Sequence, residues 1–181
     1  MAKNALRVGK PVDFSAEVPV YPPFALLAAF AASLLMWRLT GKRLRWLSWP
    51  IDSKGGRVAA FVGAVSVAVS VVDAAMRALR DAGSGINFTD VEGLATAFPF
   101  DATRNPVYAC LLFVFTPALA VLIDSAWPLV FFPLLYAYVS DIVIPAEEEQ
   151  LLRAFGKKYA EYAAATPRLS AMGLARTAPS T

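Results

Sequence analysis

Four long apolar runs divide the chain, and each has a length suited to a membrane-crossing helix. The first covers about 18–37 and holds no charge between Glu17 and Arg38. The others cover about 58–79, 107–123 and 126–144. Because a helix rises about 1.5 Å per residue, roughly 20 residues cross a hydrocarbon layer of about 30 Å. The pattern predicts an all-α, polytopic integral membrane protein with about four transmembrane helices.

The second run is interrupted by polar residues at helical spacing. Ser66, Ser70, Asp73 and Arg77 fall on one side of a helix whose remaining positions are mostly Val, Ala and Phe. Because polar side chains facing lipid are costly, we expect this side to point into the bundle. Asp73 and Arg77 fit an ion pair near the helix end as well as they fit a substrate pathway.

The last two runs are separated only by Asp124 and Ser125, which predicts an antiparallel C-terminal helical hairpin. After Pro145, the sequence Glu147-Glu148-Glu149-Gln150 begins a cytoplasmic amphipathic helix. Acidic residues in a first turn suit the positive end of the helix dipole. Gly156 is expected to divide this helix into two shorter pieces.

The composition agrees with a membrane protein and excludes several kinds of chemistry. Hydrophobic residues make up 57% of the chain, charged residues 17%, and the mean hydropathy is +0.52. The chain has one cysteine and no histidine, which excludes an internal disulfide, histidine-ligated zinc and histidine-dependent nucleophilic catalysis. We expect no metal and no nucleic-acid partner, because the basic residues behind the +3 charge flank apolar runs.

A basic connector between the first two runs complicates the orientation. Residues 38–57 hold six Lys and Arg, with Trp46 and Trp49 among them and Trp37 just before, as in a segment at headgroup depth. With four spans and a cytoplasmic N-terminus, this connector lies outside, against the tendency of basic residues to remain inside. Either the other basic residues set the orientation, or one early span does not fully cross.

The predicted hairpin brings two distant segments to one side of the membrane. A chain that crosses twice returns to its starting face, so residues 98–108 and 145–168 meet there. This places Arg104, Tyr108, the glutamates after Pro145 and two tyrosines at one interfacial pocket.

Both segments carry motifs. Before the hairpin stands Arg104-Asn105-Pro106-Val107-Tyr108, and after it stand Glu147-Glu148, Leu151, Phe155-Gly156, Tyr159, Tyr162 and Pro167-Arg168. Over these roughly 65 residues the chain resembles the isoprenylcysteine carboxyl methyltransferase and phospholipid N-methyltransferase superfamily of membrane enzymes. It departs from that pattern at Phe98-Pro99-Phe100-Asp101, where family members often have Gly-Pro-(Phe or Tyr)-Arg.

The resemblance implies a single methyltransferase-like domain over 1–181, with S-adenosylmethionine held by residues 98–108 and 145–168. By that similarity Arg104 and Glu148 are catalytic. The implied cofactor contacts are Arg104, Asn105, Pro106, Tyr108, Glu147, Glu148, Tyr159, Tyr162 and Arg168. An arginine can hold the cofactor's carboxylate, a glutamate its ribose or ammonium group, and a tyrosine face its sulfonium or adenine.

The implied function is methyl transfer to a lipophilic or membrane-partitioning acceptor, in a bacterial inner membrane with the cofactor site facing the cytoplasm. A prenylcysteine carboxylate, a lipid amine and a small thiol remain open as acceptors. One alternative is a membrane reductase of the sterol-reductase-like branch that uses NADPH. The other is a membrane scaffold without activity.

Overall fold

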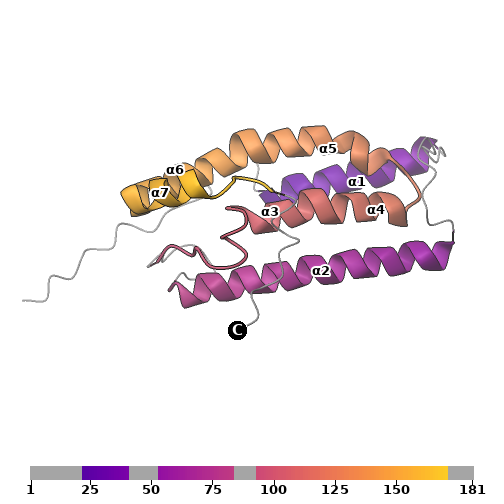
Figure 1. Ribbon diagram of the computed structural model, residues 1–181. Helices are drawn as coiled ribbons and strands as arrows, with labels where there is room; N and C mark the ends of the chain where they lie inside the picture. Colours follow the sequence, from indigo (N-terminus) through magenta and orange to yellow (C-terminus); the bar gives the residue numbers. More distant parts are fainter. Residues whose placement is uncertain (1–21, 41–52, 84–92, 171–181) are drawn as a thin grey trace, which may run out of the picture.

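The computed structural model describes residues 22–40, 53–83 and 93–170, and this part of the chain is helical, without a strand. The all-α prediction is confirmed for these residues. Figure 1 shows the long helices side by side along one common direction. The elements are α1 (Pro22–Thr40), α2 (Lys54–Asp81), α3 (Pro106–Cys110), α4 (Thr116–Leu122), α5 (Trp127–Tyr138), α6 (Ile144–Phe155) and α7 (Lys157–Ala165), with π-helical turns η2 (Leu111–Phe115) and η3 (Val139–Val143).

Several of these elements join into longer helices. The segments α3, η2 and α4 form one helix over Pro106–Leu122, and α5, η3 and α6 form another over Trp127–Phe155. The chain turns back between them at residues 123–126, where Asp124 adopts a φ of 53° and α4 packs against α5. On either side, α1 packs against α5, and α2 packs against α3, η2 and α4.

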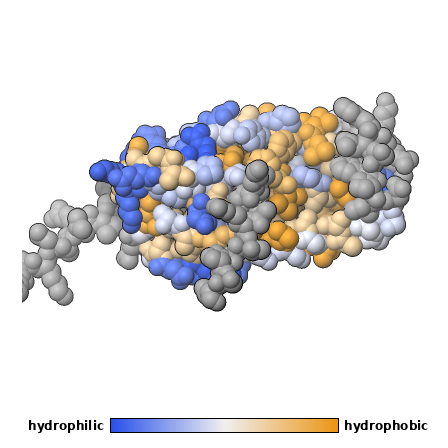
Figure 2. Space-filling model, in the orientation of Figure 1, coloured by the Kyte–Doolittle hydropathy of each residue, from blue (hydrophilic) through white to orange (hydrophobic). Residues whose placement is uncertain are grey.

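Two helices of the described part are long and apolar enough to cross a membrane. These are Lys54–Asp81, of 28 residues, and Trp127–Phe155, of 29 residues. The helices over Phe24–Thr40 and Pro106–Leu122 are apolar but shorter. In Figure 2 hydrophobic side chains cover much of the bundle, whereas hydrophilic ones gather at the end that carries α6 and α7.

Both π-helical turns end two residues before a proline. Thr116 separates η2 from Pro117, and Ile144 separates η3 from Pro145. A proline has no N–H to donate, and its ring crowds the carbonyl four residues earlier. The wider turn relieves this crowding, and the N–H groups of Thr116 and Ile144 bond to the carbonyls of Leu111 and Val139. Both helices therefore continue past their prolines.

This continuity corrects the interpretation of the acidic turn after Pro145. Glu147 lies inside a helix that already runs from Trp127, so it is not at the N-terminus of that helix. The helix dipole stabilises acidic residues only in the first turn of a helix, so it does not explain the glutamates that follow Pro145.

The polar side of α2 is also placed differently from the prediction. Ser66, Ser70, Asp73 and Arg77 are exposed on the described structure, and the buried side is formed by Val71, Ala75 and Ala78. These small residues let α2 approach its neighbours closely, which leaves no room there for longer polar groups. The serine hydroxyls donate to carbonyls of their own helix, and Asp73 pairs with Arg77.

A small apolar core lies where the helices meet. Its buried members are Leu26, Leu112, Leu135, Val139 and Ile144, from α1, η2, α5, η3 and α6. The rings of Phe30 and Phe115 extend it, with centroids 4.9 Å apart. Because the core draws on α1 and on the helices Pro106–Leu122 and Trp127–Phe155, it fixes their relative positions.

Polar contacts close the end of the bundle away from α6 and α7. Arg57 at the start of α2 pairs with Asp124 in the turn, with 3.5 Å between Nη1 and Oδ2. The indole N–H of Trp127 donates to the Thr40 hydroxyl over 3.3 Å. The predicted basic connector falls mostly at 41–52, so its tryptophans Trp46 and Trp49 lie outside the described residues.

The predicted break at Gly156 is confirmed. Here α6 ends at Phe155, Gly156 adopts φ 53° and ψ −125°, and α7 begins at Lys157. An L-residue rarely adopts this conformation, and glycine adopts it without a Cβ clash.

We expect Gly156→Ala to lower the free energy of unfolding by about 1–3 kcal/mol, because alanine is strained at this φ. Gly63→Ala is the matched control, since a Cβ meets nothing within 4 Å at either position and Gly63 lies inside α2. In a helix interior alanine is favoured by about 0.5–1 kcal/mol, so the control should be slightly stabilised. Thermal unfolding in detergent measures both, and equal shifts would contradict the assignment.

Candidate functional site

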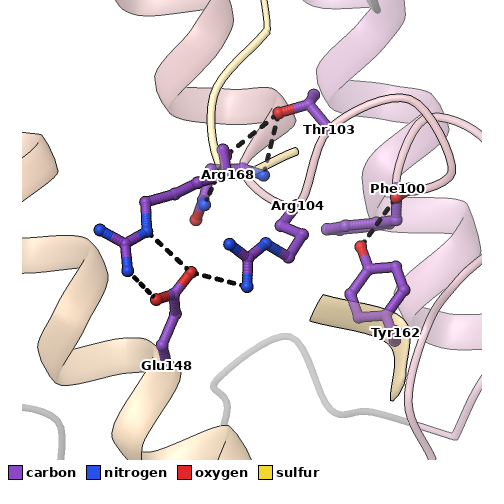
Figure 3. A network of polar contacts seen from close by, with 7 residues as sticks. Phe100, Thr103, Arg104, Glu148, Tyr162 and Arg168 are labelled. Atoms are coloured by element: carbon purple, nitrogen blue, oxygen red, sulfur yellow. Dashed lines mark hydrogen bonds and ion pairs between the residues drawn. The ribbon is translucent and has the colours of Figure 1, made fainter. Parts of the chain in front are cut away.

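Two segments far apart in sequence are joined by hydrogen bonds to backbone carbonyls at the polar end of the bundle. The Arg104 N–H donates to the Pro167 carbonyl over 3.0 Å. The Arg168 carbonyl accepts from the Asn105 side-chain amide at 2.9 Å and from the Thr103 hydroxyl at 3.3 Å. These bonds hold the loop before α3 against the segment after α7, and they place Arg104 and Arg168 side by side (Figure 3).

The carboxylate of Glu148 lies between these two arginines. Arg168 binds it through both ends of its guanidinium fork, with Nε 3.1 Å from Oε1 and Nη2 2.6 Å from Oε2. Arg104 Nη1 lies 3.1 Å from Oε1. The side chains of Arg104 and Glu148 are only 13% and 16% exposed, whereas that of Arg168 is 44% exposed. Arg104 and Glu148 are therefore shielded from water, and Arg168 forms the open side of the cluster.

Two tyrosines of α7 line the cluster from the other side. Tyr159 is buried beside Arg104, and burial raises the pKa of its hydroxyl. The Tyr162 hydroxyl donates to the Phe100 carbonyl over 2.7 Å (Figure 3). Burial raises the pKa of the Tyr162 hydroxyl as well. Both phenols therefore stay neutral, and Tyr162 ties α7 to the loop.

Glu147 has surroundings quite different from those of Glu148. It accepts a hydrogen bond of 2.6 Å from the hydroxyl of Tyr108, whose ring packs against the apolar core. Glu147 lies beyond the apolar stretch that ends at Ile144, and it is partly buried. Burial raises its pKa from 4.5 to about 7; the Tyr108 hydrogen bond lowers the pKa, and the neighbouring charge of Glu148 raises it. Adjacent glutamates thus have separate environments, one ionic and one apolar.

The ionic cluster has unused capacity for an anion. Two guanidinium groups share one carboxylate, which leaves an excess of positive charge. In the described part of the chain, Arg104 Nε is buried and has no acceptor. An unpaired buried donor costs about 1–3 kcal/mol, so a ligand that supplied an acceptor here would gain that much.

The structure brings most of the predicted site residues together. Arg104, Asn105, Glu148 and Arg168 form one hydrogen-bonded cluster, and Tyr159 and Tyr162 flank it. Tyr108 and Glu147 form a separate pair nearer the apolar core. Pro106 is buried at the start of α3 and offers no polar side chain, so its part is to begin that helix.

Sequence reasoning missed two groups. Thr103 is fully buried; its hydroxyl donates to the Arg168 carbonyl and accepts from the Asn105 N–H over 3.4 Å. The Phe100 carbonyl receives the Tyr162 hydroxyl. Thr103 directly precedes the arginine motif at Arg104. Its position beside a motif expected to contact the segment near Arg168 was the signal in the sequence that could have identified it.

Because the pKa of Glu147 is raised in the folded protein, its ionisation should oppose folding. Between about pH 4.5 and 7 the unfolded chain loses this proton first, so stability falls as pH rises, by on the order of 3 kcal/mol once both states are ionised. We expect Glu147→Gln to be increasingly more stable than the wild type from pH 5 to pH 8. Thermal midpoints in detergent give this difference, and a gap independent of pH would contradict the assignment.

Comparison with known protein families, with curated protein sequences and with solved structures found no match. The superfamily resemblance therefore depends on the motif residues and on how they lie together.

Proposed function

We propose that this chain is an integral membrane methyltransferase that uses S-adenosylmethionine, with its cofactor site at the α6–α7 end of the bundle. The observation that carries the proposal is the placement of Glu148 between Arg104 and Arg168. These residues belong to the two motifs separated by the long helices, and the superfamily resemblance requires those motifs to share one site.

The membrane part of the proposal is supported by the surface of the helices. Large apolar side chains are exposed along them, among them Leu39 at 67%, Val62 at 56% and Leu134 at 71%. Water disfavours such a surface, whereas lipid does not. We infer four crossings, made by α1, α2, the helix Pro106–Leu122 and the apolar part of Trp127–Phe155. The last two would form the hairpin, and the polar end would face the cytoplasm of a bacterial inner membrane.

The residues present fit S-adenosylmethionine. Its carboxylate would supply the acceptor that buried Arg104 Nε lacks, and Arg168, at the open side of the cluster, would share in binding it. Glu148 would bind the ammonium group or the ribose hydroxyls of the cofactor. The ring face of Tyr159 would pack against its sulfonium or adenine. When bound, the cofactor supplies an electrophilic methyl group on a sulfonium.

The chain's own contribution would be positioning and the exclusion of water. The hydrogen bonds between 103–105 and 167–168 keep both arginines in place before any ligand arrives, so little conformational freedom is lost on binding. The acceptor would approach from the apolar side, where Phe30, Tyr108 and Leu169 pack against the core. A lipophilic or membrane-partitioning acceptor suits that surface.

Calorimetry with purified protein in detergent tests the cofactor. We expect S-adenosylmethionine to bind and Arg104→Lys to weaken binding by roughly tenfold or more, because lysine keeps the charge but not the fork that includes Nε. Arg153→Lys is the control, since Arg153 is an exposed arginine paired with Glu149 on α6. Binding of NADPH instead would favour a reductase, and binding of neither would favour a scaffold without activity.

Cysteine labelling tests the topology. Lys54→Cys, Asp101→Cys and Lys158→Cys are introduced singly after Cys110→Ala, which removes the only cysteine. With four crossings, a membrane-impermeant maleimide should reach position 54 in intact spheroplasts and positions 101 and 158 only after permeabilisation. Labelling of 101 and 158 from opposite sides would rule out the shared site.

A further inference from the structure

The two adjacent glutamates of α6 differ in a way that bears on the chemistry of the acceptor. The oxygens of Glu148 already accept from Arg104 and Arg168, which ties its carboxylate to the ionic cluster. Glu147 points elsewhere, toward α3, and its hydrogen bond comes from Tyr108. No ion pair to Glu147 occurs in the described part of the chain.

We propose that Glu147 accepts the proton of the methyl acceptor, and that the acceptor is therefore a thiol or an amine and not a carboxylate. This inference rests on the proposed function. A carboxylate attacks as an anion and needs no base, whereas a thiol or an ammonium group must lose a proton to become a nucleophile.

The position of Glu147 suits this role. Its partner Tyr108 joins the polar end to the apolar core, since the ring packs on the core and the hydroxyl reaches the carboxyl. An acceptor held by its apolar part on this core would lie near Tyr108, whose hydroxyl contacts the Glu147 carboxyl. The chain has no histidine to compete for the proton.

The charged and titratable groups around Glu147 leave it free to change protonation. On its own helix Glu148 repels a second negative charge, and from α3 the Tyr108 hydroxyl stabilises the ionised form. Arg104 and Arg168 are engaged with Glu148, and on η3 Asp141 accepts from the Ser140 hydroxyl. The raised pKa, about 7, lets the carboxyl take up and release a proton near neutral pH.

The proposed step is balanced without a further reactant beyond the sulfonium methyl donor. The lone pair of the acceptor's sulfur or nitrogen forms the bond to the methyl carbon. The bond from that carbon to the donor's sulfur breaks, and its electron pair stays on that sulfur, which becomes a neutral thioether. The acceptor's proton passes to the Glu147 carboxylate and then to water at the polar end.

Transfer of a labelled methyl group tests the step with three probes of equal chain length: dodecanethiol, dodecylamine and dodecanoate. We expect the thiol or the amine to be methylated and Glu147→Gln to lower its rate roughly a hundredfold. Although the resemblance implies a cofactor contact for Glu147, its carboxyl lies on Tyr108 and not on the arginines, so binding of S-adenosylmethionine should change little in this variant. Glutamine still accepts the Tyr108 hydrogen bond but takes no proton, so a merely structural Glu147 predicts a wild-type rate. Glu149→Gln, on the exposed side of α6, serves as the control.

An infrared titration provides a readout that needs no acceptor. The wild type should show a protonated carboxyl band that disappears as pH rises through about 7 and is absent in Glu147→Gln. If Glu147 is ionised throughout, or if only dodecanoate is methylated and the glutamine variant is unaffected, this inference is wrong while the methyltransferase proposal stands. If S-adenosylmethionine does not bind the wild type, the proposed function itself fails.

Discussion

The carboxylate of Glu148 is the contact on which the site depends. It neutralises one of two guanidinium groups that would otherwise face each other in a partly enclosed place, where charge repulsion is strong. Apart from this contact, a few hydrogen bonds to the carbonyls of Pro167 and Arg168 join the loop before α3 to the segment after α7. Without the carboxylate the two arginines would push these segments apart, and the tyrosines of α7 would lose their common surface with the loop.

The apolar helices serve this contact by returning the chain to its starting end. The helix Pro106–Leu122 leads away from the polar end, the turn at 123–126 reverses the chain, and the next helix brings it back as far as Phe155. Arg57 and Asp124 hold the far end together. A shared core of residues from α1, η2, α5, η3 and α6 then fixes how the returning helix is rotated. The rotation decides that Glu148 faces the arginines while Glu147 faces Tyr108.

Sequence reasoning anticipated much of this arrangement because the signals concerned were local or followed from chain reversal. Apolar length predicted the helices, Gly156 predicted the break, and the return of the chain predicted that Arg104 and Glu148 lie together. It failed where the outcome depended on neighbouring helices. Periodicity showed that Ser66 and Asp73 share a side of α2, but small residues on the opposite side packed inward. The sequence predicts a helix that begins after Pro145, whereas the preceding helix continues through it, because a widened turn before a proline leaves no mark in composition.

The π-helical turn at 139–143 affects how this sequence aligns with one that has a regular helix there. A π-helical turn holds one residue more than a regular one, and each residue of a helix turns the chain by about 100°. A chain with a regular helix here and one residue fewer in 139–143 would present its two glutamates to the same sides as this one does. Equivalent carboxylates would then differ in spacing from the turn at 123–126, and a correct alignment would need a gap inside an unbroken helix.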